Sequence, residues 1–271
     1  MCFTRASLRS VKQQQIIYNN FERSNKIYIN KIILDDMRKN ILITGMPRSG
    51  KSTILKKIIQ KFDYKVGFVT NEVRKDDERV GFELETHKGT KSMLASVDFK
   101  TNFKVSRYFV DIRNLDEIIT KVDNFNEQDF LFLDEIGQME LFSEKFKILV
   151  ERYLNSFNVC IATLSKVYSN KFIEDIKTRK DIFLIEITEE NRDSKEKYIE
   201  TLLKKIAKAK RYASEPNRFS INQKEVSIST DHGTRILTKQ KEGWICNCDF
   251  FQENKICSHI IALEEYLKTH E

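Results

Sequence analysis

Residues 40–59 have the sequence NILITGMPRSGKSTILKKII, and this stretch decides the fold. It opens with an apolar run of strand length, and apolar residues then follow at the spacing of one helix face, at Leu55, Ile58 and Ile59. Between the two, residues 45–52 fit the pattern G-x-x-x-x-G-K-S. A glycine-bearing loop that joins a buried strand to the start of a helix turns backbone amides and the helix dipole towards phosphate. We therefore predict a phosphate-binding loop.

The residue types of this loop suit a nucleoside triphosphate with Mg²⁺. Lys51 neutralises charge on the β- and γ-phosphates and is an expected catalytic residue, and the Ser52 hydroxyl can ligate the ion. The backbone of the loop is expected to surround the phosphates. The predicted nucleotide-binding residues are Gly45, Met46, Pro47, Arg48, Ser49, Gly50, Lys51, Ser52 and Thr53.

A second motif lies at residues 130–135, where the apolar run FLFL is followed by two acids. A strand that ends in an acid is the usual partner of a phosphate loop, and we expect Asp134 to hold Mg²⁺ together with Ser52. Because side chains alternate along a strand, Glu135 is expected to point to the opposite side. There it can orient or deprotonate the attacking water, which makes it an expected catalytic residue.

The remaining pattern between residues 40 and 208 alternates short apolar runs with amphipathic stretches, which indicates an α/β domain. We predict the P-loop NTPase fold, a mostly parallel sheet flanked by helices. Strands are also predicted at residues 66–70, 80–85, 107–112, 159–164 and 182–187, and helices at residues 115–125, 143–155 and 193–208.

Several of these residues are similar to a known family. Residues 66–82, with Gly67-Phe68 and Thr70-Asn71-Glu72-Val73-Arg74, together with the stretch DEIGQMEL at 134–141, resemble the small P-loop nucleoside-triphosphatase family named for thermophilic and cancer-related members. The resemblance covers about residues 40–208. It implies slow hydrolysis of ATP, GTP and other nucleoside triphosphates with loose base preference. Two positions depart from the family pattern: Arg48 stands where glycine is usual, and Gln138 where lysine is common.

Three arginines are candidates for stabilising charge in the transition state, as arginine fingers do. These expected catalytic residues are Arg74, Arg79 and Arg107. The alternative for each is an ordinary surface salt bridge, and the sequence does not choose among them.

The C-terminal segment has a different pattern of predicted secondary structure, with β-type stretches at 225–230, 234–239 and 243–246 and a final helix at 258–269. The pattern C-x-C, eight residues, then C-x-H offers three thiolates and one imidazole to a single tetrahedral ion, for which zinc is favoured. The predicted ligands are Cys246, Cys248, Cys257 and His259. Residues 209–271 resemble the SWIM-type zinc finger, which implies binding of DNA or of proteins. We thus predict a small zinc-binding domain built from a β-hairpin and a helix.

Three parts follow from these patterns: a basic extension at residues 1–39, the NTPase domain at 40–208 and the zinc finger domain at 209–271. The formal net charge of +7 lies mainly in residues 1–40, which carry 8 Lys and Arg against 3 Asp and Glu. Residues 209–271 carry 9 of each sign. Because binding to a phosphate backbone rests on clustered cations, this balance leaves protein and nucleic acid about equally expected as partners.

No apolar run approaches the ~20 residues of a membrane-spanning helix, and no signal-like segment opens the chain, so we expect no membrane association and a cytoplasmic protein. The leftover Cys2 and Cys160 are expected to be plain thiols. The leading functional hypothesis is hydrolysis of a nucleoside triphosphate to the diphosphate and phosphate. The alternatives are a nucleotide or polynucleotide kinase, and a module whose binding to DNA or protein is controlled by nucleotide. The sequence does not indicate the base, the acceptor, the partner or the oligomeric state.

Overall fold

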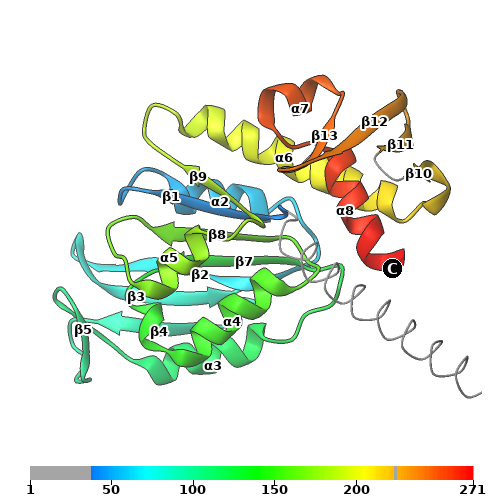
Figure 1. Ribbon diagram of the computed structural model, residues 1–271. Helices are drawn as coiled ribbons and strands as arrows, with labels where there is room; N and C mark the ends of the chain where they lie inside the picture. Colours follow the sequence, from blue (N-terminus) through cyan, green and yellow to red (C-terminus); the bar gives the residue numbers. More distant parts are fainter. Residues whose placement is uncertain (1–37, 223–224, 271) are drawn as a thin grey trace, which may run out of the picture. The chain divides into compact units, whose positions relative to one another are not determined.

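The computed structural model describes residues 38–222 and 225–270 (Figure 1). Contacts between these residues divide them into two compact units, 38–202 and 203–270, with the division inside one helix. The basic extension predicted for residues 1–39 falls outside the described residues except for its last two, and Cys2 lies outside them as well.

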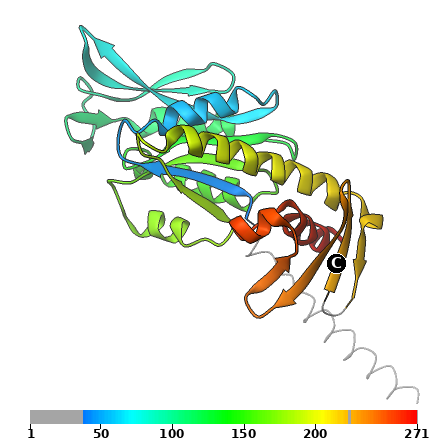
Figure 2. The same ribbon diagram turned by 90° about the horizontal axis from the view of Figure 1, so that it is seen from above.

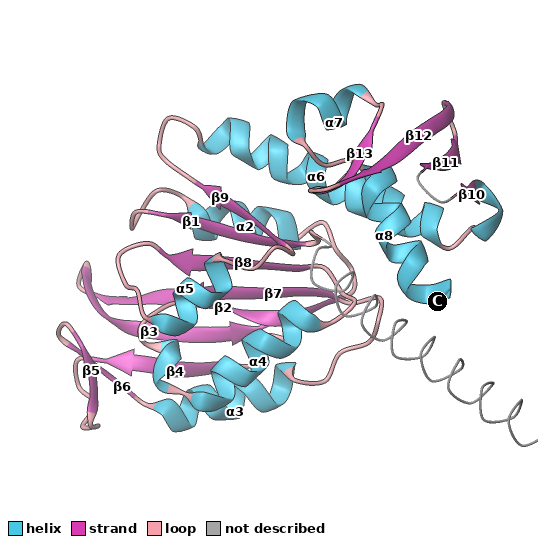
Figure 3. Cartoon of the chain, viewed as in Figure 1, coloured by secondary structure: helices cyan, strands magenta, loops and turns pink. Residues whose placement is uncertain are grey.

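Among the described residues, a nine-stranded mixed sheet forms the centre of the first unit (Figure 3). Its strand order is β5-β6-β4-β3-β2-β7-β8-β1-β9. Strands β2, β7, β8, β1 and β9 pair in parallel, and β3, β4, β6 and β5 extend the sheet beyond β2 with antiparallel pairing. The bounds are β1 Asn40–Gly45, β2 Lys65–Lys75, β3 Glu78–Thr86, β4 Lys91–Ser96, β5 Phe103–Val105, β6 Tyr108–Val110, β7 Phe130–Ile136, β8 Cys160–Ser165 and β9 Ile182–Glu186.

Helices cover both faces of the parallel half (Figure 2). Helix α2 (Lys51–Ile59) lies on one face, and α3 (Ile112–Val122), α4 (Glu144–Asn155) and α5 (Lys171–Lys177) lie on the other. Ion pairs from Lys57 to Glu196 and from Lys61 to Glu200 hold the first half of α6 (Arg192–Ala213) beside α2. The short 3₁₀ helix η1 (Glu140–Phe142) follows β7.

Burial explains why these residues form these elements. All six residues of β1 and of β8 are buried, as expected for strands whose two faces are both covered by helices. Helix α3 buries apolar residues at i, i+3, i+4 and i+7 and begins at Asp111, whose side chain accepts a hydrogen bond from the Arg113 amide. Because the parallel strands end at the same edge, the loops after β1, β7 and β8 come together there.

The predicted α/β class is confirmed, but of the antiparallel half of the sheet only β3 and β6 were predicted as strands. Strands β4 and β5 were missed, and β2 runs five residues beyond the predicted end at Thr70. The extension of β2 was missed because residues 71–79, NEVRKDDER, lack an apolar periodicity. Here β2 and β3 project as a two-stranded arm in which Arg74 and Arg79 both pair with Glu72, so charge pairs replace apolar contacts.

The second unit contains the end of α6 and an antiparallel sheet of order β10-β11-β12-β13. Its bounds are β10 Phe219–Ile221, β11 Glu225–Thr230, β12 Gly233–Gln240, β13 Gly243–Cys246, α7 Asp249–Asn254 and α8 Ser258–His270, with a 3₁₀ turn η2 at Pro216–Arg218. The three predicted strands and the final helix are present, whereas β10 and α7 were missed. Helix α6 continues to Ala213, five residues past the predicted helix end. Among the described residues, no helix has both the length and the apolar composition needed to cross a membrane.

Candidate functional site

The phosphate loop lies between the carboxyl end of β1 and the start of α2. Gly45 has a φ of 152°, and a Cβ there would lie 2.3 Å from the carbonyl oxygen of Ile187, so only glycine fits. Helix α2 begins at Lys51, and Gly50 precedes it without a side-chain cap. The first amides of the helix are therefore left to face an anion.

Lys51 is almost buried inside this loop. Its Nζ donates hydrogen bonds to the carbonyl oxygens of Gly45, at 3.0 Å, and Met46, at 3.2 Å. The same nitrogen lies 4.0 Å from Oε2 of Glu135. The loop thus holds an ammonium group between its own backbone and the acids at the end of β7.

Asp134 is buried at the end of β7, with 1% of its surface exposed. Its Oδ1 accepts hydrogen bonds from the hydroxyls of Ser52, at 2.9 Å, and Thr163, at 2.5 Å. Its Oδ2 is buried and has no hydrogen-bond partner among the described residues. Burial raises the pKa of Asp134 above its usual value, although the two hydroxyls act in the other direction. A buried carboxylate oxygen without a partner is the feature that a bound cation would satisfy.

Glu135 lies on the same side as Asp134, which differs from the expected alternation. Both carboxyl groups line one cavity. The pairing of β7 with β8 shifts register between Leu133 and Ile136, and this irregularity breaks the alternation of side chains at the strand end. Burial raises the pKa of Glu135, and the nearby charge of Lys51 opposes that shift.

The cavity has a volume of about 590 Å³ and collects residues from the loop, from the ends of β2, β3, β7 and β8, and from β5. Of the predicted residues, it is lined by Gly45, Pro47, Arg48, Lys51, Ser52, Arg79, Asp134 and Glu135. The predicted residues that do not line it are Met46, Ser49, Gly50, Thr53, Arg74 and Arg107. Its walls beyond these are formed by Thr70, Glu72, Phe82, Val105, Gly137, Gln138, Met139, Glu140, Ser165, Lys166, Val167 and Tyr168.

The three candidate arginines all have hydrogen-bond partners within the protein. Arg74 donates to Glu72 and to the carbonyl oxygen of Asp77 on the exposed arm. Arg107 donates to the carbonyl oxygen of Arg79 and to the hydroxyl of Tyr108. Arg79 donates to Tyr108, at 3.0 Å, and to Glu72. The surface salt-bridge alternative thus describes Arg74, and only Arg79 of the three reaches the cavity.

Glu140 is a cavity residue that sequence reasoning missed. It is 5% exposed, and burial raises its pKa to about 8, with the charge of Glu135 adding to the effect. A Cβ on Gly137 would lie 3.0 Å from Oε2 of Glu140 and 3.2 Å from Oε1 of Glu135, so glycine at 137 allows both carboxyl groups to approach. The only feature of the sequence that could have indicated a buried acid here is that Glu140 stands among the apolar residues Ile136, Met139 and Leu141.

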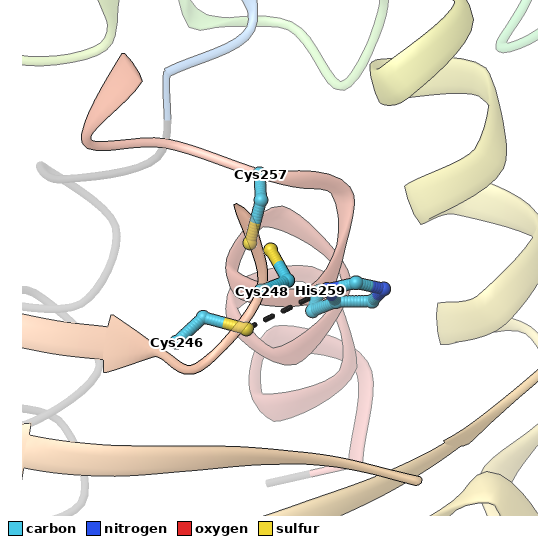
Figure 4. A group of neighbouring side chains, drawn as sticks. All are labelled: Cys246, Cys248, Cys257 and His259. Carbon is cyan, nitrogen blue, oxygen red and sulfur yellow. Dashed lines mark hydrogen bonds between the residues drawn. The ribbon is translucent and has the colours of Figure 1, made fainter. Parts of the chain in front are cut away.

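The four predicted zinc ligands meet in the second unit (Figure 4). Cys246 ends β13, Cys248 precedes α7, and Cys257 and His259 stand at the start of α8. Their ligand atoms all lie within 4.8 Å of one another and all four residues are buried. The Sγ of Cys246 is 3.5 Å from Nδ1 of His259. Tetrahedral zinc places such ligand atoms roughly 3.5–3.8 Å apart, so the donor set and spacing fit this ion.

The thiols of this cluster favour a bound cation. Hydrogen bonds from Cys257 and His259 lower the pKa of Cys246 to about 4, and a hydrogen bond from Cys257 lowers that of Cys248 to about 6. The pKa of Cys257 is raised in turn because it donates to both. The lowered pKa values of Cys246 and Cys248 favour the thiolate, which is the form that binds zinc. Cys160, in contrast, is a buried thiol of β8, and burial raises its pKa to about 12.

Comparison with known proteins identifies the family. A family model described as NTPase matches residues 40–200, more than half of the chain. The chain belongs to this family. The predicted family and the predicted enzyme class, a nucleoside-triphosphatase, are confirmed. A second family model, described as SWIM zinc finger, matches residues 225–268 and includes all four predicted ligands, so the predicted SWIM-type module is confirmed too.

Relatives of this NTPase include the nucleoside-triphosphatase THEP1 of Thermotoga maritima, which is 40% identical over 156 residues, 57% of this chain and 89% of the relative. The human cancer-related nucleoside-triphosphatase is 31% identical over 175 residues, 58% of this chain and 92% of that protein. The crystal structure of THEP1 from Aquifex aeolicus superposes with a TM-score of 0.53 at 34% identity, over 59% of this chain and 96% of that one.

Proposed function

We propose that the chain is a Mg²⁺-dependent enzyme that hydrolyses a nucleoside triphosphate to the diphosphate and phosphate. The observation that carries this proposal is the meeting of Lys51, Ser52, Asp134 and Glu135 in one cavity at the end of the phosphate loop. The loop supplies the phosphate cradle, and the acids of β7 supply the groups that a hydrolytic reaction needs beside the γ-phosphate.

The residues around Ser52 fit a magnesium ion. The Ser52 hydroxyl and the unpartnered Oδ2 of Asp134 would hold it, because hydroxyl and carboxylate oxygens are the ligands that Mg²⁺ prefers. When bound, Mg²⁺ neutralises charge on the β- and γ-phosphate oxygens. Lys51 adds its positive charge to the same oxygens by exchanging the carbonyls of Gly45 and Met46 for phosphate.

Glu135 is the group that acts on water. Its carboxylate orients a water molecule whose oxygen attacks the γ-phosphorus, while the bond from that phosphorus to the bridging oxygen breaks and its electron pair leaves with the diphosphate. Glu135 accepts the proton that the water loses. Burial suits this task, since it raises the pKa of Glu135 and with it the basicity of the carboxylate, while the nearby charge of Lys51 acts in the other direction.

A kinase is the alternative that one observation favours. Besides the phosphate loop and the acids of β7, the cavity is lined by Glu72 on β2, Phe82 on β3 and Val105 on β5, and an acceptor would lie against these residues. In that case Glu135 would take the proton of an acceptor hydroxyl, and the γ-phosphoryl group would pass to that oxygen.

The zinc module is proposed to bind a partner, with protein and nucleic acid kept as equal alternatives. In this division of labour, residues 40–208 hydrolyse the nucleotide and residues 209–271 hold one zinc ion through Cys246, Cys248, Cys257 and His259. A third alternative within the same proposal is that nucleotide hydrolysis controls when the zinc module binds and releases its partner. Three thiols that remain reduced for zinc support a cytoplasmic location.

Incubation of the full chain with γ-labelled ATP separates these functions. With Mg²⁺ present and no acceptor, label is expected in free phosphate, and chelation of Mg²⁺ is expected to stop its release. Label that appears on an added nucleoside or on a DNA 5′ end, with little free phosphate, would replace the hydrolase by the kinase. Release of phosphate that does not depend on Mg²⁺ would contradict the roles of Ser52 and Asp134.

A further inference from the structure

We propose that Arg48, which belongs to the phosphate loop itself, is the cation that contacts the γ-phosphoryl oxygens in the transition state. It would act within the chain as an arginine finger does. This inference rests on the proposed hydrolysis and assigns the role that the sequence left open among Arg74, Arg79 and Arg107. Arg48 would contribute only hydrogen bonds and charge to the γ-phosphoryl oxygens, so the water proton still goes to Glu135 and the electron pair still leaves with the diphosphate.

The first support is the charge distribution of the cavity. Its lining cations are Arg48, Lys51, Arg79 and Lys166. Lys51 is bound to loop carbonyls, Arg79 is held by Glu72 and Tyr108, and Lys166 pairs with Glu186. Arg48 is exposed and makes no hydrogen bond or ion pair with any other residue in the described part of the chain. Of the four lining cations, Arg48 therefore alone needs no protein contact broken before it meets a phosphate.

The second support is the backbone. Arg48 has a φ of 68°, in the left-handed region where glycine is strongly preferred. A residue with a Cβ is disfavoured relative to glycine in this conformation because the Cβ crowds the neighbouring backbone. Arg48 thus places a long cationic side chain at a backbone position that favours glycine, and strained positions of this kind are concentrated at functional sites. Because residue 48 lies in the loop that wraps the phosphates, its side chain begins beside them.

The third support is the position of the competing arginines. Arg74 and Arg107 do not line the cavity, and both donate hydrogen bonds to other residues of the described chain. Arg79 does line it, but its guanidinium also stacks over Phe82, at 5.0 Å, and over Tyr108, at 5.6 Å. Movement of Arg79 towards phosphate would break its contacts with Glu72 and both rings. Arg48 has no such contacts to lose.

The test compares Arg48→Gly, Arg48→Lys and Arg79→Ala in the full chain. Arg48→Gly is expected to fold at least as well as the parent, since glycine suits the left-handed position. Its kcat is expected to fall about 10²-fold or more, with a KM change of less than about threefold, because an arginine in this role acts mainly in the transition state. Arg48→Lys is expected to keep part of the activity. Arg113→Ala, a change at an exposed arginine on α3, is the control and is expected to leave kcat unchanged.

Binding of a transition-state analogue distinguishes a role of Arg48 in the transition state from a purely structural role. Binding of ADP with aluminium fluoride, an analogue of the transition state, is expected to weaken in Arg48→Gly about as much as kcat falls, while binding of ADP alone stays as in the parent. Free guanidinium is expected to restore part of the activity of Arg48→Gly. A kcat for Arg48→Gly within threefold of the parent would overturn the inference, as would loss of analogue binding in Arg79→Ala but not in Arg48→Gly. If the parent itself does not hydrolyse ATP with Mg²⁺, the proposed function fails instead.

Discussion

The hydroxyl of Ser52, on α2, lies 2.9 Å from Oδ1 of Asp134, at the end of β7, although 82 positions separate the two residues in the chain. This contact joins the phosphate loop to the acidic strand and leaves Oδ2 of Asp134 without a partner in the described structure. Glu135, one residue further, contacts the loop through Lys51 instead. The two neighbouring acids therefore have different surroundings, and different functions are expected of them.

The first prediction separates these acids. Asp134→Asn is expected to weaken Mg²⁺-dependent binding of nucleotide, because an amide offers the ion a neutral oxygen. Glu135→Gln is expected to retain nucleotide affinity within about threefold and to lose hydrolysis by ~10²–10⁴-fold, because an amide accepts no proton from water. Calorimetric titration with ADP, with and without Mg²⁺, and phosphate release check both. Equal loss of affinity in the two variants would contradict the assignment.

The second prediction concerns Lys51. Lys51→Ala is expected to remove most turnover, since the ammonium group is held inside the loop that we propose to bind the β- and γ-phosphates. Lys57→Ala is the matched control, because Lys57 lies on the same helix but forms an exposed ion pair with Glu196. Steady-state phosphate release should fall in the first variant and stay near the parent in the second. Turnover of Lys51→Ala within a few-fold of the parent would show that this loop is not the phosphate site.

The third prediction is a pH dependence set by Glu140. Its pKa of about 8 in the folded chain lies above the ordinary value of 4.5, so the folded state favours the protonated form. The stabilisation that comes from this shift is complete below pH 4.5 and is lost as the pH rises towards 8. Between these two values, the free energy of unfolding falls by about 1.4 kcal/mol per pH unit. Glu140→Gln, which stays neutral, is therefore expected to be more stable than the parent at pH 9 and to differ little near pH 5.

Thermal unfolding followed by circular dichroism at pH 5, 7 and 9 measures this effect. Glu144→Gln serves as the control because it removes the same charge from an exposed side chain four residues away. Parallel Tm profiles for the parent and Glu140→Gln across this range would mean that Glu140 is ionised in the folded protein at every pH tested.

Local spacing carried most of what could be predicted. The strand, loop and helix around residues 40–59 and the Cys and His spacing after residue 245 predicted two sites whose residues the structure brings together. The side on which Glu135 lies could not be predicted, because the irregular pairing at the end of β7 is a property of two strands. Glu140 was missed since a single acid among apolar residues has no periodic signature.

The contacts of the three arginines could not be predicted, and the reason is non-local. Whether Arg74, Arg79 or Arg107 reaches the cavity depends on the antiparallel pairing of β2, β3, β4 and β6. Residues 71–79, which form the projecting ends of β2 and β3, are rich in charged residues, and strand pairing across such a segment is not visible in the sequence. Arg48 was visible in the sequence as a departure from the family's usual glycine, but its left-handed backbone and its lack of protein contacts are properties of the folded loop.

The last prediction concerns zinc, and the single tryptophan of the chain makes it measurable. Trp244 lies on β13, two residues before Cys246, with Lys239 5.1 Å from the centre of its ring. We expect one zinc per chain by elemental analysis, and Cys257→Ser or chelation is expected to expose Trp244 and shift its fluorescence to the red. The shift is expected because structural zinc contributes ~10–16 kcal/mol to the folding of small modules.

Hydrolysis without a partner is expected to survive the loss of zinc. Every residue that lines the nucleotide cavity belongs to the unit formed by residues 38–202, whereas the four zinc ligands belong to the other unit. After chelation and restoration of Mg²⁺, phosphate release by the parent should return to its earlier rate, and Cys257→Ser should match it. A chain that ends at residue 208 should also hydrolyse ATP. Any stimulation of hydrolysis by DNA or by a protein partner should be absent from the chelated parent, from Cys257→Ser and from the truncated chain. Loss of basal hydrolysis together with the Trp244 shift would show that the nucleotide site depends on the zinc module.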